Sequence, residues 1–166
     1  MDYIQSLRAE HGDPSERSQK KLIATMTQDV MDFIQQSPFA VLSTSDANGS
    51  CDASPRGGTP GFIKILNEKT LLIPDVKGNK LFQSYSNILE NPHAALVFFI
   101  PGNDRMVRVN GTVKILKKEE IQSTLTKAEV NEPDENAELI QALVLTIHQA
   151  YSHCPRALKF SNLWQS

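Results

Sequence analysis

The sequence predicts a mainly β protein with helices, in which short strands form an antiparallel sheet or barrel and a helical arm precedes them. Several short runs are apolar or alternate between apolar and polar side chains, and turn residues such as Asn48 and Gly49 separate them. Between residues 22 and 34, in contrast, apolar side chains recur at three- and four-residue spacing, which is typical of an amphipathic helix.

Length and composition are those of an ordinary globular protein. The chain has 166 residues, of which 40% are hydrophobic and 22% charged, which is enough for one domain with a core. We expect a single domain over residues 1–166, divided into a helical arm (1–37), a barrel core (38–116) and a segment with a helix, the last strand and a C-terminal tail (117–166). The net charge of −2 indicates neither a nucleic-acid nor a membrane partner.

The sequence also suggests a cellular location. It has no apolar run near the ~20 residues of a membrane span, and residues 1–5 lack the basic and apolar regions of a secretory signal. Cys51 and Cys154 lie far apart in sequence and suit a reducing compartment better than a disulfide framework. We therefore expect a cytoplasmic protein.

The arm is expected to be helical. Residues 2–10 suit one short helix, and Asp13 and Pro14 then read as the N-cap and first position of another. An apolar stripe follows, with a break between two helices near residues 25–27, and Pro38 ends it. The residues that carry the stripe are Met26, Val30, Phe33 and Ile34.

Four short strands come next, and tight turns connect them. Asn48 and Gly49 form a hairpin turn, because this pair tolerates positive φ angles. Gly57 begins a flexible loop between the second and third strands. The expected strands are residues 39–45, 50–56, 62–66 and 71–73.

The stretch over residues 71–82 carries the strongest functional signal. It begins as an apolar strand, breaks at Pro74 and enters a helical segment, with Lys77 and Lys80 where the helix would start. A helix N-terminus presents unpaired N–H groups and a positive dipole end, so added lysines predict a site for an anion such as phosphate. Neither the Walker A pattern nor G-x-G-x-x-G is present, and an ordinary strand–helix connection with solvated lysines is the alternative interpretation.

The second half continues the pattern of strands with inserted helices. A helical stripe over 81–89 ends at Pro92, and residues 94–100 are apolar throughout, which predicts a strand buried on both faces. A further strand is expected at 105–115, with Gly111 at a bulge. The remaining expectations are a helix at 117–125, an acidic surface loop at 129–138, a strand at 143–151 for which a helix is the alternative, and a short helix that begins at Pro155.

Six segments occur in an order that matches a known family. The segments are 52–58 (Asp-Ala-Ser-Pro-Arg-Gly-Gly), 73–80, 87–92, 96–102, 108–111 (Arg-Val-Asn-Gly) and the tail 153–164. On these segments the chain resembles the pyridoxamine 5'-phosphate oxidase-like proteins, the FMN-binding split β-barrel group, and is most similar to the oxidase-related branch rather than to the biosynthetic enzyme. The resemblance spans roughly residues 13–164.

The resemblance implies a six-stranded antiparallel split barrel, a homodimer, and FMN bound at the dimer interface. Lys80 matches the family's phosphate-binding lysine, whereas Asn79 stands where the biosynthetic oxidases carry arginine, so Lys77 and Arg56 are expected to supply that contact. The resemblance assigns the tail to the flavin site of the second subunit. The full set of expected cofactor-binding residues is Ser54, Arg56, Gly57, Ile73, Pro74, Asp75, Lys77, Asn79, Lys80, Arg108, Arg156 and Trp164.

Three functions follow from this resemblance. The first is a homodimeric, FMN-dependent oxidoreductase with a small-molecule redox substrate, in which the flavin does the chemistry and the protein binds and tunes it. The second is a flavin-binding module without turnover, such as a carrier or redox sensor. The third is a split barrel that binds another anionic cofactor, such as haem. No metal site is expected, because His153 and Cys154 are too few ligands for zinc, and no catalytic side chain is assigned.

Overall fold

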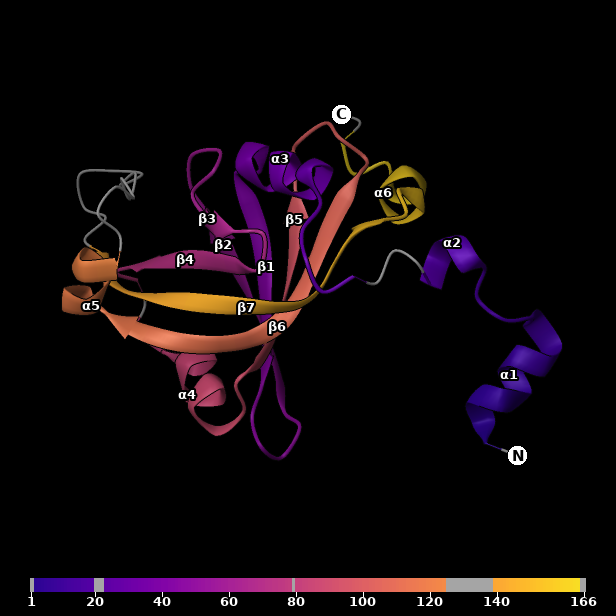
Figure 1. Cartoon of the computed structure of the whole chain (residues 1–166), viewed down its shortest axis with the longest axis horizontal. Helices are drawn as coiled ribbons and strands as arrows, with labels where there is room; N and C mark the ends of the chain where they lie inside the picture. The colour runs from indigo at the N-terminus through magenta and orange to yellow at the C-terminus, as the bar shows by residue number, and fades with distance from the viewer. Residues whose placement is uncertain (1, 20–22, 79, 125–138, 165–166) are drawn as a thin grey trace.

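Seven strands and six helices make up the part of the chain that the computed structural model describes, which comprises residues 2–19, 23–78, 80–124 and 139–164 (Figure 1). The predicted mainly β fold with antiparallel strands and helices is confirmed. The elements are α1 (Tyr3–His11), α2 (Glu16–Gln19), α3 (Gln28–Gln36), β1 (Phe39–Ser45), β2 (Cys51–Gly57), β3 (Lys64–Asn67), β4 (Thr70–Val76), α4 (Gln83–Glu90), β5 (His93–Phe99), β6 (Met106–Lys117), α5 (Lys118–Thr124), β7 (Leu139–His153) and α6 (Arg156–Ser161).

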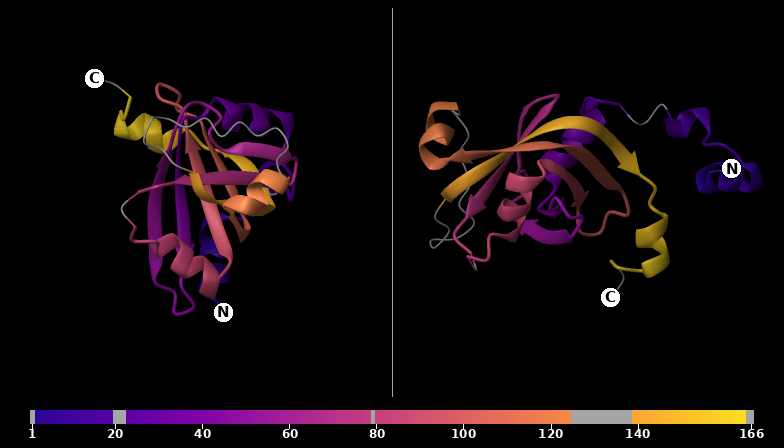
Figure 2. Two further views of the ribbon diagram at one scale, coloured as in Figure 1. Left: turned by 90° about the vertical axis from the view of Figure 1, so that its left-hand side faces the viewer. Right: turned by 90° about the horizontal axis from the view of Figure 1, so that it is seen from below.

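The strands form one antiparallel sheet in the order β2-β1-β5-β6-β7-β4-β3. This sheet has one strand more than the six that the resemblance implies. The long strands β6 and β7 cross its middle, and the sheet curls around them (Figures 1 and 2). β2 lies at one edge and β3 at the other, so no backbone ladder closes the curled sheet among the described residues.

One main hydrophobic cluster fills the inside of the sheet. Leu42 on β1, Leu96 and Phe98 on β5, and Leu145 on β7 are all fully buried there. The prediction that β5 is buried on both faces is wrong. Its side chains alternate, and the outward-facing Val97 is only half-buried, because helices and strands cover one face of the sheet.

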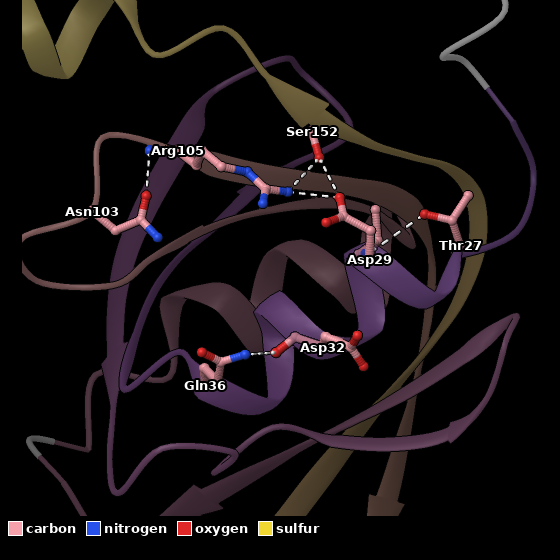
Figure 3. A network of polar contacts seen from close by, with 8 residues as sticks. Thr27, Asp29, Asp32, Gln36, Asn103, Arg105 and Ser152 are labelled. Atoms are coloured by element: carbon pink, nitrogen blue, oxygen red, sulfur yellow. Dashed lines mark hydrogen bonds and ion pairs between the residues drawn. The ribbon is translucent and has the colours of Figure 1, made fainter.

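Helix α3 closes one end of the barrel, where Val30, Phe33 and Ile34 enter the core as the apolar stripe predicts. It begins at the predicted break, since the Thr27 hydroxyl accepts a hydrogen bond from the Val30 N–H at 3.4 Å and caps the helix. On its exposed side, Arg105 Nη2 lies 2.6 Å from Asp29 Oδ2 (Figure 3). This ion pair joins α3 to the turn between β5 and β6.

The first two helices lie apart from the sheet (Figures 1 and 2). Helix α1 has a capping box made by Asp2 and Gln5, yet none of its residues is buried. Among the described residues, no helix is long and apolar enough to cross a membrane.

Two boundaries around the central stretch differ from the prediction. β4 does not break at Pro74 but continues to Val76, paired with β7. β3 pairs with β4 only as far as Leu72, so Pro74 has a neighbouring strand on one side alone, where a missing N–H is tolerated. The following helix begins at Gln83, later than the two lysines. Asn79 and the acidic stretch 129–138 lie outside the described residues.

The predictions for β6 and β7 are confirmed. The register between the two strands shifts at Gly111, and the extra residue is His148 on β7. A side chain at position 111 would not fit, because its Cβ would lie 2.0 Å from the carbonyl oxygen of Thr146. The ambiguous stretch at 143–151 is a strand, since it lies within β7 and pairs on both sides.

Candidate functional site

A pocket of about 470 Å³ opens where the edge strand β2 faces the end of β4 and the start of α4. Its walls come from β2 and the loop after it, from the last residues of β4, from the β4–α4 connection, from the first turn of α4 and from Ile140 on β7. Residues that line it include Asp52, Ser54, Arg56, Gly57, Phe62, Pro74, Asp75, Lys77, Lys80, Leu81, Phe82, Ser84 and Tyr85.

The register of the sheet explains why the polar residues of β2 point into this pocket. Ser54 pairs with Leu42 and Arg56 pairs with Ala40, and both β1 partners are fully buried on the inner face. Residues directly opposite each other on paired strands share a face. Because β2 is an edge strand at the mouth of the barrel, its inner face is lined by hydrogen-bonding side chains instead of apolar ones.

An ion pair bridges the open side of the barrel. Arg56 Nη1 on β2 lies 2.5 Å from Asp75 Oδ1 on β4, and the two side chains are only 15% and 13% exposed. β2 and β4 are not neighbours in the sheet order, so this contact joins two parts of the sheet that share no backbone hydrogen bonds. The ion pair therefore forms the buried floor of the pocket and is a side-chain link between β2 and β4.

Tyr85 completes the floor. It projects from the first turn of α4 and is 7% exposed, and burial together with the negative charge of Asp75 raises the pKa of its phenol far above the usual value near 10. Its hydroxyl lies near the Asp75 carboxylate and the Gln141 side chain but makes no hydrogen bond of good geometry with a described residue, and the same holds for Nε of Arg56. Buried polar atoms are almost always hydrogen-bonded in folded proteins, so two unpartnered donors in one pocket indicate a place for a bound molecule.

The mouth of the pocket is cationic and partly apolar. Lys77 and Lys80 are exposed there, and neither forms an ion pair with another described residue. Lys80 and Phe82 have φ angles of 63° and 52°, which are uncommon for residues other than glycine. Phe82 precedes α4 and offers no side-chain cap, so the first N–H groups of the helix remain for solvent or a ligand.

A second polar contact fixes the start of α4. The hydroxyl of Ser84, which is 2% exposed, donates a hydrogen bond of 3.0 Å to Asp52 Oδ2 on β2. This hydrogen bond joins α4 to β2 on one side of the pocket, and the ion pair between Arg56 and Asp75 joins β4 to β2 on the other side.

The structure brings together seven of the twelve expected binding residues. Ile73 is fully buried in the core and does not line the pocket, and Asn79 is outside the described residues. The residues that line the pocket are Ser54, Arg56, Gly57, Pro74, Asp75, Lys77 and Lys80.

The other three expected residues lie elsewhere in the same chain. Arg108 is on the outer face of β6, where its Nη1 donates to the Tyr151 hydroxyl at 3.2 Å. Trp164 donates a hydrogen bond from Nε1 to the Asn103 carbonyl at 3.1 Å. The Arg156 guanidinium lies over the ring of Phe160, 5.3 Å from its centroid, on the same helix α6. None of the three lines the pocket of its own chain.

Sequence reasoning missed Asp52, Ser84 and Tyr85 as pocket residues. For Tyr85 the signal was present but incomplete, since its place in the helical stripe predicted burial and said nothing of where its hydroxyl would lie. Among the described residues, no group of three or more metal-ligating side chains occurs, and Cys51 and Cys154 are both free and exposed.

Fold and site together define an antiparallel barrel with a pocket at its open side that Lys77 and Lys80 help to line. A family model described as pyridoxamine 5'-phosphate oxidase matches residues 26–154, which is more than half of the chain. The chain therefore belongs to this family, as the sequence resemblance indicated.

Solved structures share the fold at low sequence identity. HupZ from Group A Streptococcus is 18% identical, with a TM-score of 0.58, over 76% of this chain and 93% of its own. A Lactobacillus delbrueckii protein provisionally assigned as a pyridoxamine 5'-phosphate oxidase is 21% identical, with a TM-score of 0.58, over 79% of this chain and 98% of its own. An FMN-binding protein from Syntrophomonas wolfei is 15% identical, with a TM-score of 0.55, over 91% of this chain and 97% of its own. A search of curated proteins found no match.

Proposed function

We propose that this protein is a homodimeric, FMN-binding oxidoreductase that holds the flavin in the pocket between β2, β4 and α4. The observation that carries the proposal is the pocket itself, where the exposed lysines Lys77 and Lys80 and the uncapped start of α4 meet above two unpartnered buried donors. Family membership and the likeness to the FMN-binding protein of Syntrophomonas wolfei support the choice of flavin.

The residues present fit a phosphorylated flavin. The pocket volume of about 470 Å³ falls within the range of roughly 300–1,000 Å³ that is usual for cofactor-sized ligands. The lysines attract a phosphate group as point charges, and free N–H groups at a helix start add hydrogen bonds. Bound FMN would supply the electron or hydride transfer, while the chain binds it, orients it and keeps water from part of its surface.

A homodimer would complete this site. On the outer face of the sheet, a continuous row runs across five strands through Pro55, Val41, Val97, Arg108 and Tyr151, which pair in that order. Its first three members are apolar, and none of the five is fully buried in the single chain. A second copy that packs on this face would bury the apolar part and could bring Arg108 and the tail residue Trp164 near the flavin of its partner.

FMN titration of the purified protein tests the proposal directly. We expect a shift of the flavin absorption bands and saturable binding, and we expect Lys80→Ala to weaken FMN binding about tenfold, because it removes one exposed charge contact to phosphate. Lys114→Ala is the matched control, since Lys114 is exposed on β6 and does not line the pocket. Equal FMN affinity of the two variants would contradict the assigned phosphate position.

Three further measurements separate the alternatives. Oxidation of NADH or NADPH by the FMN-loaded protein would support an oxidoreductase, whereas bound FMN with no turnover would favour a carrier or redox sensor. Tight binding of haem in place of FMN would overturn the choice of cofactor. The mass in solution, measured by light scattering, tests the homodimer.

A further inference from the structure

The floor of the pocket holds two hydrogen-bond donors that the chain itself leaves unused. The Tyr85 hydroxyl and Nε of Arg56 are buried, and neither makes a hydrogen bond of good geometry with a described residue, although the Asp75 carboxylate and the Gln141 side chain lie near the hydroxyl. The tyrosine side chain is more than nine-tenths buried, because the whole residue is only 7% exposed. An unsatisfied buried donor is a substantial cost to the folded state, so both atoms are placed where a ligand acceptor would offset that cost.

The charges of the floor indicate which kind of acceptor fits. The guanidinium of Arg56 is compensated by Asp75 through a contact of 2.5 Å, so the floor carries no net charge. A phosphate placed there would lie against the Asp75 carboxylate. At the mouth, Lys77 and Lys80 have no anionic partner among the described residues, and an anion is favoured there instead.

Tyr85 is also fixed in its role as a donor. Burial and the nearby negative charge of Asp75 raise the pKa of its phenol above the usual value near 10, so the hydroxyl carries its proton at neutral pH. A protonated phenol beside an arginine N–H can donate to a hydroxyl or carbonyl oxygen, both of which accept hydrogen bonds without carrying a charge.

We propose that the Tyr85 hydroxyl and Arg56 Nε form a subsite that recognises an uncharged oxygen of the bound cofactor, such as a hydroxyl or a carbonyl, while the cofactor's phosphate lies at the lysine-rich mouth. This inference rests on the proposed function, since it describes how the same pocket orients FMN. It makes Tyr85 a binding residue that acts on the part of FMN that riboflavin shares.

The test compares FMN with riboflavin, which lacks the phosphate, on four proteins: the wild type, Tyr85→Phe, Lys80→Ala and the control Tyr3→Phe. Tyr3 is 74% exposed on α1 and does not line the pocket. We expect Tyr85→Phe to weaken both ligands by the same factor, about fivefold to tenfold for one lost hydrogen bond. Lys80→Ala should weaken FMN alone, and Tyr3→Phe should change neither affinity.

A second readout does not depend on ligand binding. Tyr85→Phe removes an unpartnered buried hydroxyl and keeps the ring, so the ligand-free variant should melt at the same temperature as the wild type or higher. A clear drop in melting temperature would mean that the hydroxyl has a partner in the free protein, which would overturn the inference.

The outcomes distinguish the inference from the proposed function. If Tyr85→Phe weakens FMN but not riboflavin, the tyrosine contacts the phosphate and the assignment of the floor is wrong. If it weakens neither, the hydroxyl does not contact the cofactor, and the inference fails while FMN binding stands. If the wild type binds no flavin at all, the proposed function is wrong, and this inference, which rests on it, is wrong as well.

Discussion

Replacing Asp75 by asparagine is expected to destabilise the protein, because it removes the charge that compensates Arg56. The two side chains are 15% and 13% exposed, so most of their surface is already out of water. Breaking a fully buried ion pair by removing one partner costs about 3–5 kcal/mol. The pocket leaves the pair some contact with solvent, and the new amide oxygen can still accept a hydrogen bond, so we expect a loss of about 2–3 kcal/mol.

Urea unfolding of the ligand-free protein measures this loss, and the chain offers a matched control. Asp29→Asn removes the acid from the ion pair with Arg105, whose side chains are 62% and 45% exposed. Exposed pairs contribute less than about 1 kcal/mol. If Asp75→Asn lowers the free energy of unfolding no more than Asp29→Asn does, the contact between β2 and β4 does not hold the barrel together and our account of its open side is wrong.

Two other predictions concern β6 and the pocket floor. Gly111→Ala should cost at least about 3 kcal/mol, because its Cβ would meet the Thr146 carbonyl oxygen at 2.0 Å, whereas Gly78→Ala, with its nearest atom at 3.9 Å, should be close to neutral in a melting experiment. The raised pKa of Tyr85 means that only the unfolded chain loses this proton above pH ~10, so stability should fall as pH rises there, by up to about 1.4 kcal/mol per pH unit. The loss of stability between about pH 9 and about pH 11 should therefore be smaller for Tyr85→Phe than for the wild type; an equal pH dependence of both would contradict the buried position of the hydroxyl.

The sequence revealed the strands because their signals are local. Alternation, turn residues and the apolar stripe all act within a few neighbours, and they placed all seven strands and α3 close to where the structure has them. Gly111 was identified as a bulge for the same reason, since a glycine inside a strand often marks a bulge or a close approach of another backbone. The errors occurred where pairing between distant segments decides where a strand ends. Pro74 was taken as a strand end because the sequence does not show that β3 pairs with β4 only as far as Leu72.

The pocket shows the same division. Lys77 and Lys80 could be identified from the sequence, because they stand beside a strand–helix connection. The pairing of Arg56 with Asp75 could not, because the two residues lie on strands that are not neighbours and meet only when the sheet curls. Tyr85 was read as an apolar member of a helix stripe, and its burial agrees with that. The high pKa of its phenol depends on burial and partly on Asp75 and Arg56, which lie on distant strands, so no local sequence pattern could reveal it.

A neutral floor beneath a cationic mouth has a consequence for selectivity. The mouth attracts any anion of suitable size, since charge attraction depends little on the rest of the ligand. The floor, in contrast, requires an oxygen acceptor at a set distance from the phosphate, because Tyr85 and Arg56 are held in place by α4 and β2. Unpaired buried donors penalise a ligand that lacks this oxygen more strongly than a missing contact at the exposed lysines would. Affinity for phosphate and choice among phosphorylated cofactors would therefore be separable properties of this pocket, with the lysines responsible for the first and the Tyr85–Arg56 floor for the second.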